Sequence, residues 1–189
     1  MFSHKSYGPA YAGIGARDTP SEVLRHMKVV GENLAYEGYV LRSGHAAGAD
    51  ICFEEGAGQA DSTAGGQVHG LCEIFLPWPI FLGSYSRFER PRPEAYEIAK
   101  EYHPNWGALN GAGHDLMARN SHQILGWELN DPVKFIVCWT KGGKIVGGTG
   151  QALRMAQALN IPVVNFGNTT WEGVIAQISD LIIQVKEAT

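Results

Sequence analysis

Five short apolar segments are spaced along the chain, and most of them are continuously apolar rather than alternating with polar residues. They lie at Tyr11–Ile14, Tyr39–Arg42, Leu71–Leu76, Lys134–Trp139 and Pro162–Phe166. Continuous runs of Val, Ile, Tyr and Phe are typical of strands buried on both faces of a parallel sheet, because a solvated face would introduce alternating polar residues. The pattern therefore predicts five buried strands.

Helical spacing separates most of these segments. The first predicted helix has a capping box, with Thr19 at the N-cap, Pro20 at the first helical position and Glu22 at the third. Gly38 is expected to end it. Its apolar face consists of Val23, Met27, Val30 and Leu34. Further helices are expected at about residues 48–59, 93–102, 114–125, 148–159 and 171–185.

Alternating strands and helices predict a Rossmann-like, doubly wound α/β fold with a mainly parallel sheet and helices on both faces. The 189 residues are enough for one domain, residues 1–189. Residues 61–70 read as a loop of small residues. Residues 77–113 are rich in Pro, Trp, Tyr and Arg, and are long for a strand–helix connection, so we expect an insertion or a lid-like loop region there.

Composition indicates a globular protein rather than a disordered one, with 44% hydrophobic and 18% charged residues. No apolar run is long enough to span a bilayer, and Met1–Lys5 lacks the apolar core of a secretory signal. Cys52, Cys72 and Cys138 show no metal-type or redox spacing. We therefore expect a cytoplasmic protein without membrane association, in which Cys72 and Cys138 are buried free thiols.

The net charge of −4 provides no overall positive field to attract nucleic acid. A local basic groove is one interpretation of Arg87, Arg90 and Arg92. The alternative is a solvated loop of mixed charge, since Glu89 and Glu94 lie among these arginines.

Three glycine-rich turns each follow a predicted strand and precede a predicted helix. They occupy residues 13–17 (GIGAR), 43–50 (SGHAAGAD) and 146–150 (VGGTG). Glycine permits close approach of a ligand to the backbone, and a following helix offers free N–H groups to an anion. All three turns should lie at the carboxyl edge of the sheet, where ligands bind in open α/β folds. They indicate a nucleotide or another phosphate-bearing ligand.

The common phosphate-binding motifs do not fit these turns. Asp18 replaces the third glycine of a dinucleotide fingerprint, and the second strand ends in Arg42-Ser43 rather than in an acidic residue. No GK[ST] follows the glycines, which excludes a P-loop. The seven histidines have no metal-ligand spacing, and no nucleophile elbow or catalytic triad is present. We assign no metal, no cofactor and no catalytic residue.

Several residues in the turns have both a binding and a structural interpretation. Arg17 would contact a phosphate, or would form an ion pair with Asp18 or Glu22. Ser43 and Gly44 offer a hydroxyl and an N–H to a ligand. For Asp50 and Thr149, helix capping is the alternative to ligand contact. His45 is weak evidence for an acid or base.

The segment around Arg119 and Asn120 also has two interpretations. Asp115 lies one helical turn before Arg119, so a surface ion pair is one of them. The other places Arg119 and Asn120 in the cleft.

Taken in order, the motifs GIGAR, LRSGHAAGAD, ARN and GGT before a helix resemble the SLOG superfamily, which joins the DNA-processing protein A (DprA/Smf) proteins with the Lonely Guy proteins. The match covers about residues 11–166 and looks most like the small single-domain DprA-like proteins of bacteria and their viruses. The resemblance implies a Rossmann-like fold with a pocket for nucleotides, nucleotide-derived signals or single-stranded nucleic acid, and homo-oligomerisation. The ligand-binding residues that it implies are Gly13, Gly15, Arg17, Ser43, Gly44, Gly48, Asp50, Arg119, Asn120, Gly147, Gly148 and Thr149.

The chain departs from both branches of the family. Lonely Guy enzymes have a glutamate in the last glycine-rich loop that takes part in N-glycosidic cleavage, whereas this loop and the start of its helix contain no carboxylate and continue to Arg154. The appended domains of full-length DNA-processing proteins are absent from this sequence. We therefore expect a protein that binds a nucleotide or a nucleotide-derived small molecule, for sensing or sequestration, rather than an enzyme.

Two alternatives stay open. Single-stranded DNA would stack on Trp78, Tyr85 or Phe88 beside the arginine cluster. A phosphoribohydrolase acting on nucleoside monophosphates would need Asp50 or Asp115 in place of the missing glutamate.

Overall fold

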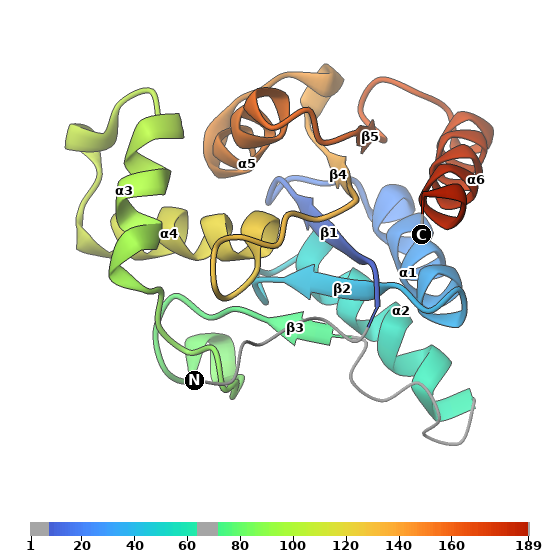
Figure 1. Cartoon of the computed structure of the whole chain (residues 1–189), viewed down its shortest axis with the longest axis horizontal. Helices are drawn as coiled ribbons and strands as arrows, with labels where there is room; N and C mark the ends of the chain where they lie inside the picture. Colours follow the sequence, from blue (N-terminus) through green and yellow to red (C-terminus); the bar gives the residue numbers. More distant parts are fainter. Residues whose placement is uncertain (1–7, 64–71, 189) are drawn as a thin grey trace.

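The computed structural model describes residues 8–63 and 72–188, and it has a single five-stranded parallel sheet at its centre (Figure 1). The strands are β1 Ala10–Gly15, β2 Val40–Ser43, β3 Cys72–Ile74, β4 Phe135–Trp139 and β5 Val163–Asn165. Their spatial order is β3-β2-β1-β4-β5. The strand order therefore reverses between β1 and β4, which is where ligands bind in open α/β sheets.

Helices cover both faces of the sheet. One face packs against α1 Ser21–Tyr36, α2 Ala49–Thr63 and α6 Trp171–Glu187, and the other against α4 Gly111–Leu125 and α5 Gly147–Ala158. Side chains of β1 alternate between the two cores, with Tyr11 in the first and Ala12 in the second. These observations confirm the doubly wound α/β fold.

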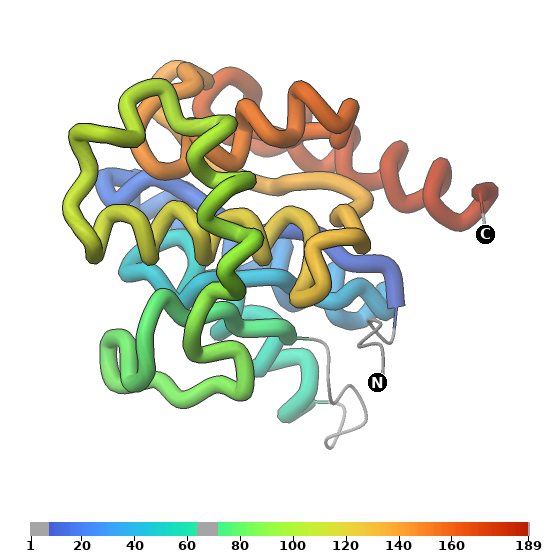
Figure 2. The backbone as a smooth tube through the Cα atoms, turned by 60° about the vertical axis from the view of Figure 1, so that its left-hand side comes forward, coloured from blue at the N-terminus to red at the C-terminus, as the bar shows by residue number. Residues whose placement is uncertain are grey.

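Residues 77–113 contain regular structure of their own. They include the short 3-10 helices η1 Phe81–Gly83 and η2 Trp106–Ala108, and helix α3 Pro93–Tyr102. Figure 2 shows α3 crossing α4, and the hydroxyl of Ser121 in α4 donates to the carbonyl of Ala95 in α3 at 3.2 Å. This segment therefore adds a layer outside α4.

Three local expectations are wrong. The predicted capping box does not form: α1 begins at Ser21 after Pro20, and the Thr19 hydroxyl donates to the carbonyl of Ala16 at 2.6 Å. Residues 61–63 belong to α2 rather than to a loop, while residues 64–70 lie outside the described residues. Cys72 is exposed at the start of the edge strand β3, whereas Cys138 is buried as expected.

The remaining element predictions agree with the structure to within a few residues. Gly38 adopts a left-handed φ of 80° directly after α1, as its role in ending the helix requires. Leu71 and the N-terminal segment Met1–Lys5 lie outside the described residues. In the ranges 8–63 and 72–188, no helix has the length and apolar character needed to cross a membrane.

Candidate functional site

A cavity of about 640 Å³ opens at the carboxyl edge of the sheet, beside the point where strand order reverses. The turns after β1 and β2, the η1 segment, α4 and the start of α5 all contribute to its walls. The predicted binding residues that line it are Gly15, Arg17, Asp50, Arg119, Asn120, Gly147, Gly148 and Thr149. The tertiary structure thus brings all three glycine-rich turns and the Arg119-Asn120 segment to one site.

The other predicted residues, Gly13, Ser43, Gly44 and Gly48, do not line the cavity. A Cβ atom on Gly13 would lie 2.6 Å from the Phe53 ring, so this glycine is needed for packing. Gly48 has a left-handed φ of 95°, which the turn before α2 requires. The Ser43 hydroxyl is hydrogen-bonded to the carboxylate of Glu54. These residues shape the turns around the cavity but do not form its wall.

Gly44 supports the site through close contact with Arg119. A Cβ atom at position 44 would lie 1.1 Å from Nη1 of Arg119, so only glycine leaves room for the guanidinium. The backbone N–H of Gly44 donates to Oδ2 of Asp50 at 3.0 Å. The second turn therefore fixes both members of the ion pair described next.

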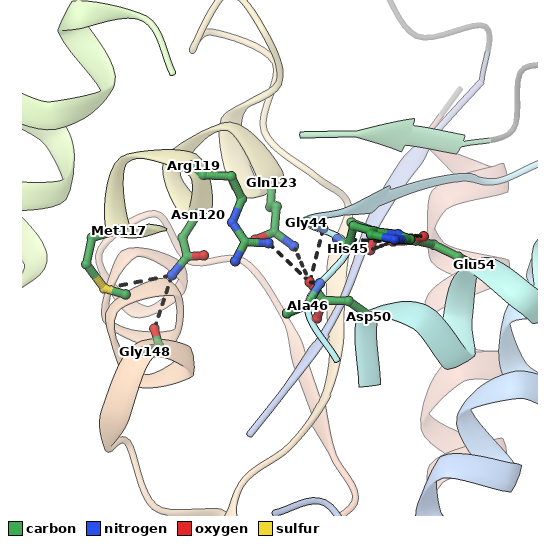
Figure 3. Close-up of polar contacts among 11 residues, drawn as sticks. Gly44, His45, Ala46, Asp50, Glu54, Met117, Arg119, Asn120, Gln123 and Gly148 are labelled. Carbon is green, nitrogen blue, oxygen red and sulfur yellow. Dashed lines mark hydrogen bonds and ion pairs between the residues drawn. The ribbon is translucent and has the colours of Figure 1, made fainter. Parts of the chain in front are cut away.

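Asp50 and Arg119 form a buried ion pair in the cavity wall, with 4% and 5% of their surfaces exposed. Nη1 of Arg119 lies 3.3 Å from Oδ2 of Asp50. The same oxygen accepts from the N–H groups of Gly44 and Ala46 and from the amide of Gln123, at 3.0, 3.4 and 3.5 Å. Figure 3 shows these donors converging on one carboxylate oxygen.

Burial shifts the titration of both partners. It raises the pKa of Asp50, and the charge and hydrogen bond of Arg119 oppose that rise without cancelling it. It lowers the pKa of Arg119, which Asp50 opposes in turn. Asp115, the alternative partner of Arg119, instead accepts a hydrogen bond from the Tyr96 hydroxyl at 2.6 Å. The interpretation of Asp115 and Arg119 as a surface ion pair is therefore wrong.

Asn120 connects α4 to the start of α5. Its Nδ2 donates to the carbonyl of Gly148 at 3.3 Å (Figure 3). Helix α5 has Val146 at its N-cap and no side-chain capping hydrogen bond. Thr149 lies within the first turn, so it does not cap the helix, and the first N–H groups of α5 are available at the cavity.

His45 has an unusual backbone conformation but does not line the cavity. Its φ is 57°, and Glu54 holds it there by accepting from both its backbone N–H at 3.1 Å and its ring Nδ1 at 2.6 Å. Burial raises the pKa of Glu54. This contact shapes the turn so that Ala46 and Ala47 face the cavity.

The η1 segment forms an apolar wall from Trp78, Phe81 and Leu82. The rings of Trp78 and Phe81 meet edge to face, with centroids 5.1 Å apart. The other aromatics considered for stacking do not line the cavity: Tyr85 is 77% exposed, and Phe88 is buried.

The arginines of the predicted basic cluster differ in their contacts, and Arg90 is exposed and lies outside the cavity lining. Arg92 pairs with Glu128, and Arg87 lies over the Phe88 ring at 4.6 Å from its centroid. Arg17 is exposed at the cavity, and within the described ranges it forms no ion pair with Asp18 or Glu22. Arg17 is therefore an exposed arginine in the cavity wall, whereas Arg119 is a buried one.

Sequence reasoning missed Gln123, Met117, Phe81 and Leu82, which also line the cavity. Gln123 lies one helical turn after Arg119, so the helical period had marked it as a neighbour. The η1 residues had no such signal, because their positive-φ turns at Ile80 and Leu82 do not follow from residue type. Among residues 8–63 and 72–188, no cluster of three or more His, Cys, Asp or Glu side chains is arranged to hold a metal ion.

No family model, curated protein or solved structure matches this chain. The resemblance to the SLOG superfamily rests on the sequence motifs and stays a prediction.

Proposed function

We propose that this protein is a SLOG-like binding protein whose cavity holds a nucleoside phosphate or a related nucleotide derivative. The observation that carries the proposal is that three features line one cavity. They are the uncapped N-terminus of α5, the buried pair of Asp50 and Arg119, and the aromatic residues of η1. The volume of about 640 Å³ lies within the range of small-molecule sites.

The phosphate belongs at the start of α5. The N–H groups of Gly147, Gly148 and Thr149 and the positive end of the helix dipole favour an anion there. Arg17 supplies a guanidinium without an ion-pair partner in the described residues.

The sugar and base have complementary surfaces next to that position. Gly44, Ala46, Arg119 and Gln123 all donate to Oδ2 of Asp50, so Oδ1 is the oxygen placed to accept from a sugar hydroxyl. Trp78 and Leu82 provide an apolar surface against which a base can pack. A nucleotide would therefore lie with its base toward η1 and its phosphate toward α5.

Calorimetric titration and thermal shift with nucleoside phosphates, cyclic dinucleotides and ADP-ribose derivatives test the proposal. We expect at least one of these compounds to bind and stabilise the protein, and Arg17→Ala to weaken that binding. Arg25→Ala, an exposed arginine on α1 away from the cavity, is the matched control. The absence of stabilisation across the whole panel would refute the proposal.

The geometry gives less support to N-glycosidic cleavage. Arg154 occupies the position of the Lonely Guy glutamate, and its Nε donates to the carbonyl of Tyr102 at 2.7 Å. Asp115 lies outside the cavity lining, and Asp50 is held by Arg119 with a raised pKa. Release of free base from nucleoside monophosphates would reverse this ranking.

Homo-oligomerisation and a cytoplasmic location remain predictions from the sequence.

A further inference from the structure

Two exposed cations follow the paired ends of β1 and β4, where strand order reverses. Gly15 at the end of β1 pairs in register with Trp139 at the end of β4, and the N–H of Ala16 donates to the carbonyl of Trp139 at 3.1 Å. Arg17 and Lys141 each follow this pair by two residues, and both are exposed. Both residues therefore lie in the turns that leave two neighbouring parallel strands at the same edge of the sheet.

The loop that carries Lys141 continues directly to the phosphate-binding end of α5. It passes Gly142 and Gly143, whose φ values of 61° and 69° are left-handed, and then Lys144, which is also exposed. A Cβ atom on Gly142 would meet nothing within 4 Å, so the backbone is open to approach on that side. The two lysines lie outside the cavity lining, on the loop that leads to its Val146 wall, and within residues 8–63 and 72–188 neither has an ion-pair partner. Asp18 is the exposed carboxylate in the facing turn.

Arg119 is an independent sign that the cavity is built for a charged ligand. It lines the cavity and is 5% exposed, yet its Nε has no hydrogen-bond partner among the described residues. A buried, incompletely satisfied guanidinium is costly unless an acceptor completes it. Arg119 adjoins Asn120, whose amide contacts Gly148 at the start of α5. The unsatisfied donor and the helix N-terminus therefore belong to one site.

We propose that the preferred ligand has two or more linked phosphates, as in a nucleoside di- or triphosphate. This inference rests on the proposed function. The first phosphate lies at the α5 N-terminus, and the next lie along Arg17, Lys141 and Lys144. A monophosphate would leave the lysines unused, whereas a longer phosphate chain meets a new cation with each added charge.

Calorimetric titration with AMP, ADP and ATP, in the presence of EDTA and at low salt, tests this inference. We expect ADP and ATP to bind about tenfold more tightly than AMP, since exposed charge pairs each contribute modestly. The preference should shrink as salt rises, because exposed charges are screened. Equal affinity for AMP and ADP would overturn the inference.

The double variant Lys141→Ala/Lys144→Ala locates the effect. We expect it to abolish the preference for ADP while leaving AMP affinity unchanged. Lys134→Ala is the matched control, because Lys134 is exposed just before β4, at the opposite edge of the sheet. A double variant that keeps the ADP preference would overturn the inference. If AMP, ADP and ATP bind with equal affinity, this inference alone fails. If none of the nucleoside phosphates, cyclic dinucleotides and ADP-ribose derivatives binds, the proposed function fails as well.

Discussion

At the scale of single residues, the cavity wall depends on the close packing of Gly44 against Arg119, which leaves no room for a side chain at position 44. Gly44 touches the guanidinium of Arg119, and that guanidinium pairs with the buried carboxylate of Asp50. Breaking a buried pair costs more than the pair contributes, because the remaining charge has neither water nor a partner. The second glycine-rich turn thus holds both charges of this ion pair in place.

Gly44→Ala should displace Arg119, since the new methyl group would lie 1.1 Å from Nη1. We expect a loss of about 2–4 kcal/mol in the free energy of unfolding, together with loss of nucleotide binding. Urea unfolding and calorimetry measure the two effects. Gly58→Ala in α2 is the control: a Cβ atom there meets nothing within 4 Å, so it should raise stability by up to about 1 kcal/mol. A stable Gly44→Ala variant would contradict the placement of Arg119.

His122 is buried, and each of its ring nitrogens has a hydrogen-bond partner. Nε2 accepts from the backbone N–H of Arg92 at 3.0 Å, so Nδ1 is the donor to the carbonyl of Gly126, also at 3.0 Å. The ring stacks with Phe75 and Trp127. Burial lowers its pKa from the ordinary 6.5 to about 4.

This pKa predicts a loss of stability in acid. Since the unfolded state takes up the proton first, the contribution of His122 is intact above pH 6.5 and declines as the pH falls toward 4. At pH 4.5 the loss should be about 2–3 kcal/mol relative to pH 7.5. The measurement is urea unfolding of the wild type and of His122→Gln at both pH values, because the variant has no titrating group at this position. Parallel pH profiles would exclude the assignment.

At the scale of elements, the turn between β1 and α1 positions Arg17. Its geometry depends on the Thr19 hydroxyl, which is buried and donates to the carbonyl of Ala16 at 2.6 Å. Gly15 packs against this hydroxyl, since a Cβ atom at position 15 would lie 3.2 Å from it. The hydroxyl therefore closes the first glycine-rich turn instead of capping the helix.

Thr19→Val removes that hydroxyl while keeping the shape of the side chain. We expect a loss of about 1–2 kcal/mol in stability and weaker nucleotide binding, because the carbonyl of Ala16 keeps only the backbone N–H of Thr19, 3.2 Å away, and the turn loosens. Thr19→Ser keeps the hydroxyl and should retain ligand affinity. Chemical denaturation and calorimetry of both variants provide the comparison, and equal behaviour of the two would indicate that the hydroxyl has no role.

At the scale of the whole molecule, the net charge of −4 disfavours a nucleic acid as the ligand. Single-stranded DNA binding needs a groove of cations along the backbone, and here Arg92 is paired with Glu128. We expect a labelled oligonucleotide to bind more weakly than a free nucleotide in fluorescence anisotropy at 50 and 200 mM salt. Tight oligonucleotide binding with a steep salt dependence would instead favour the DprA-like alternative.

Much of the architecture was predictable because it is encoded locally. Continuously apolar segments marked the buried strands, helical spacing marked the helices, and glycine-rich turns marked the carboxyl edge of the sheet. The same edge gathered most of the predicted binding residues in one cavity. These features follow from periodicity and turn chemistry, which act over a few residues.

Only the tertiary structure decided which of those residues meet. Asp50 and Arg119 are 69 positions apart, and either could have served as a surface charge. Trp78 and Leu82 became the cavity wall through a turn with left-handed residues, and Cys72 became exposed because it starts an edge strand. Such outcomes depend on which distant segments pack against each other and bury apolar surface, and no local sequence pattern contains that information. The sequence determined the glycine-rich turns at the carboxyl edge of a doubly wound sheet, and packing made that edge a cavity with a buried ion pair.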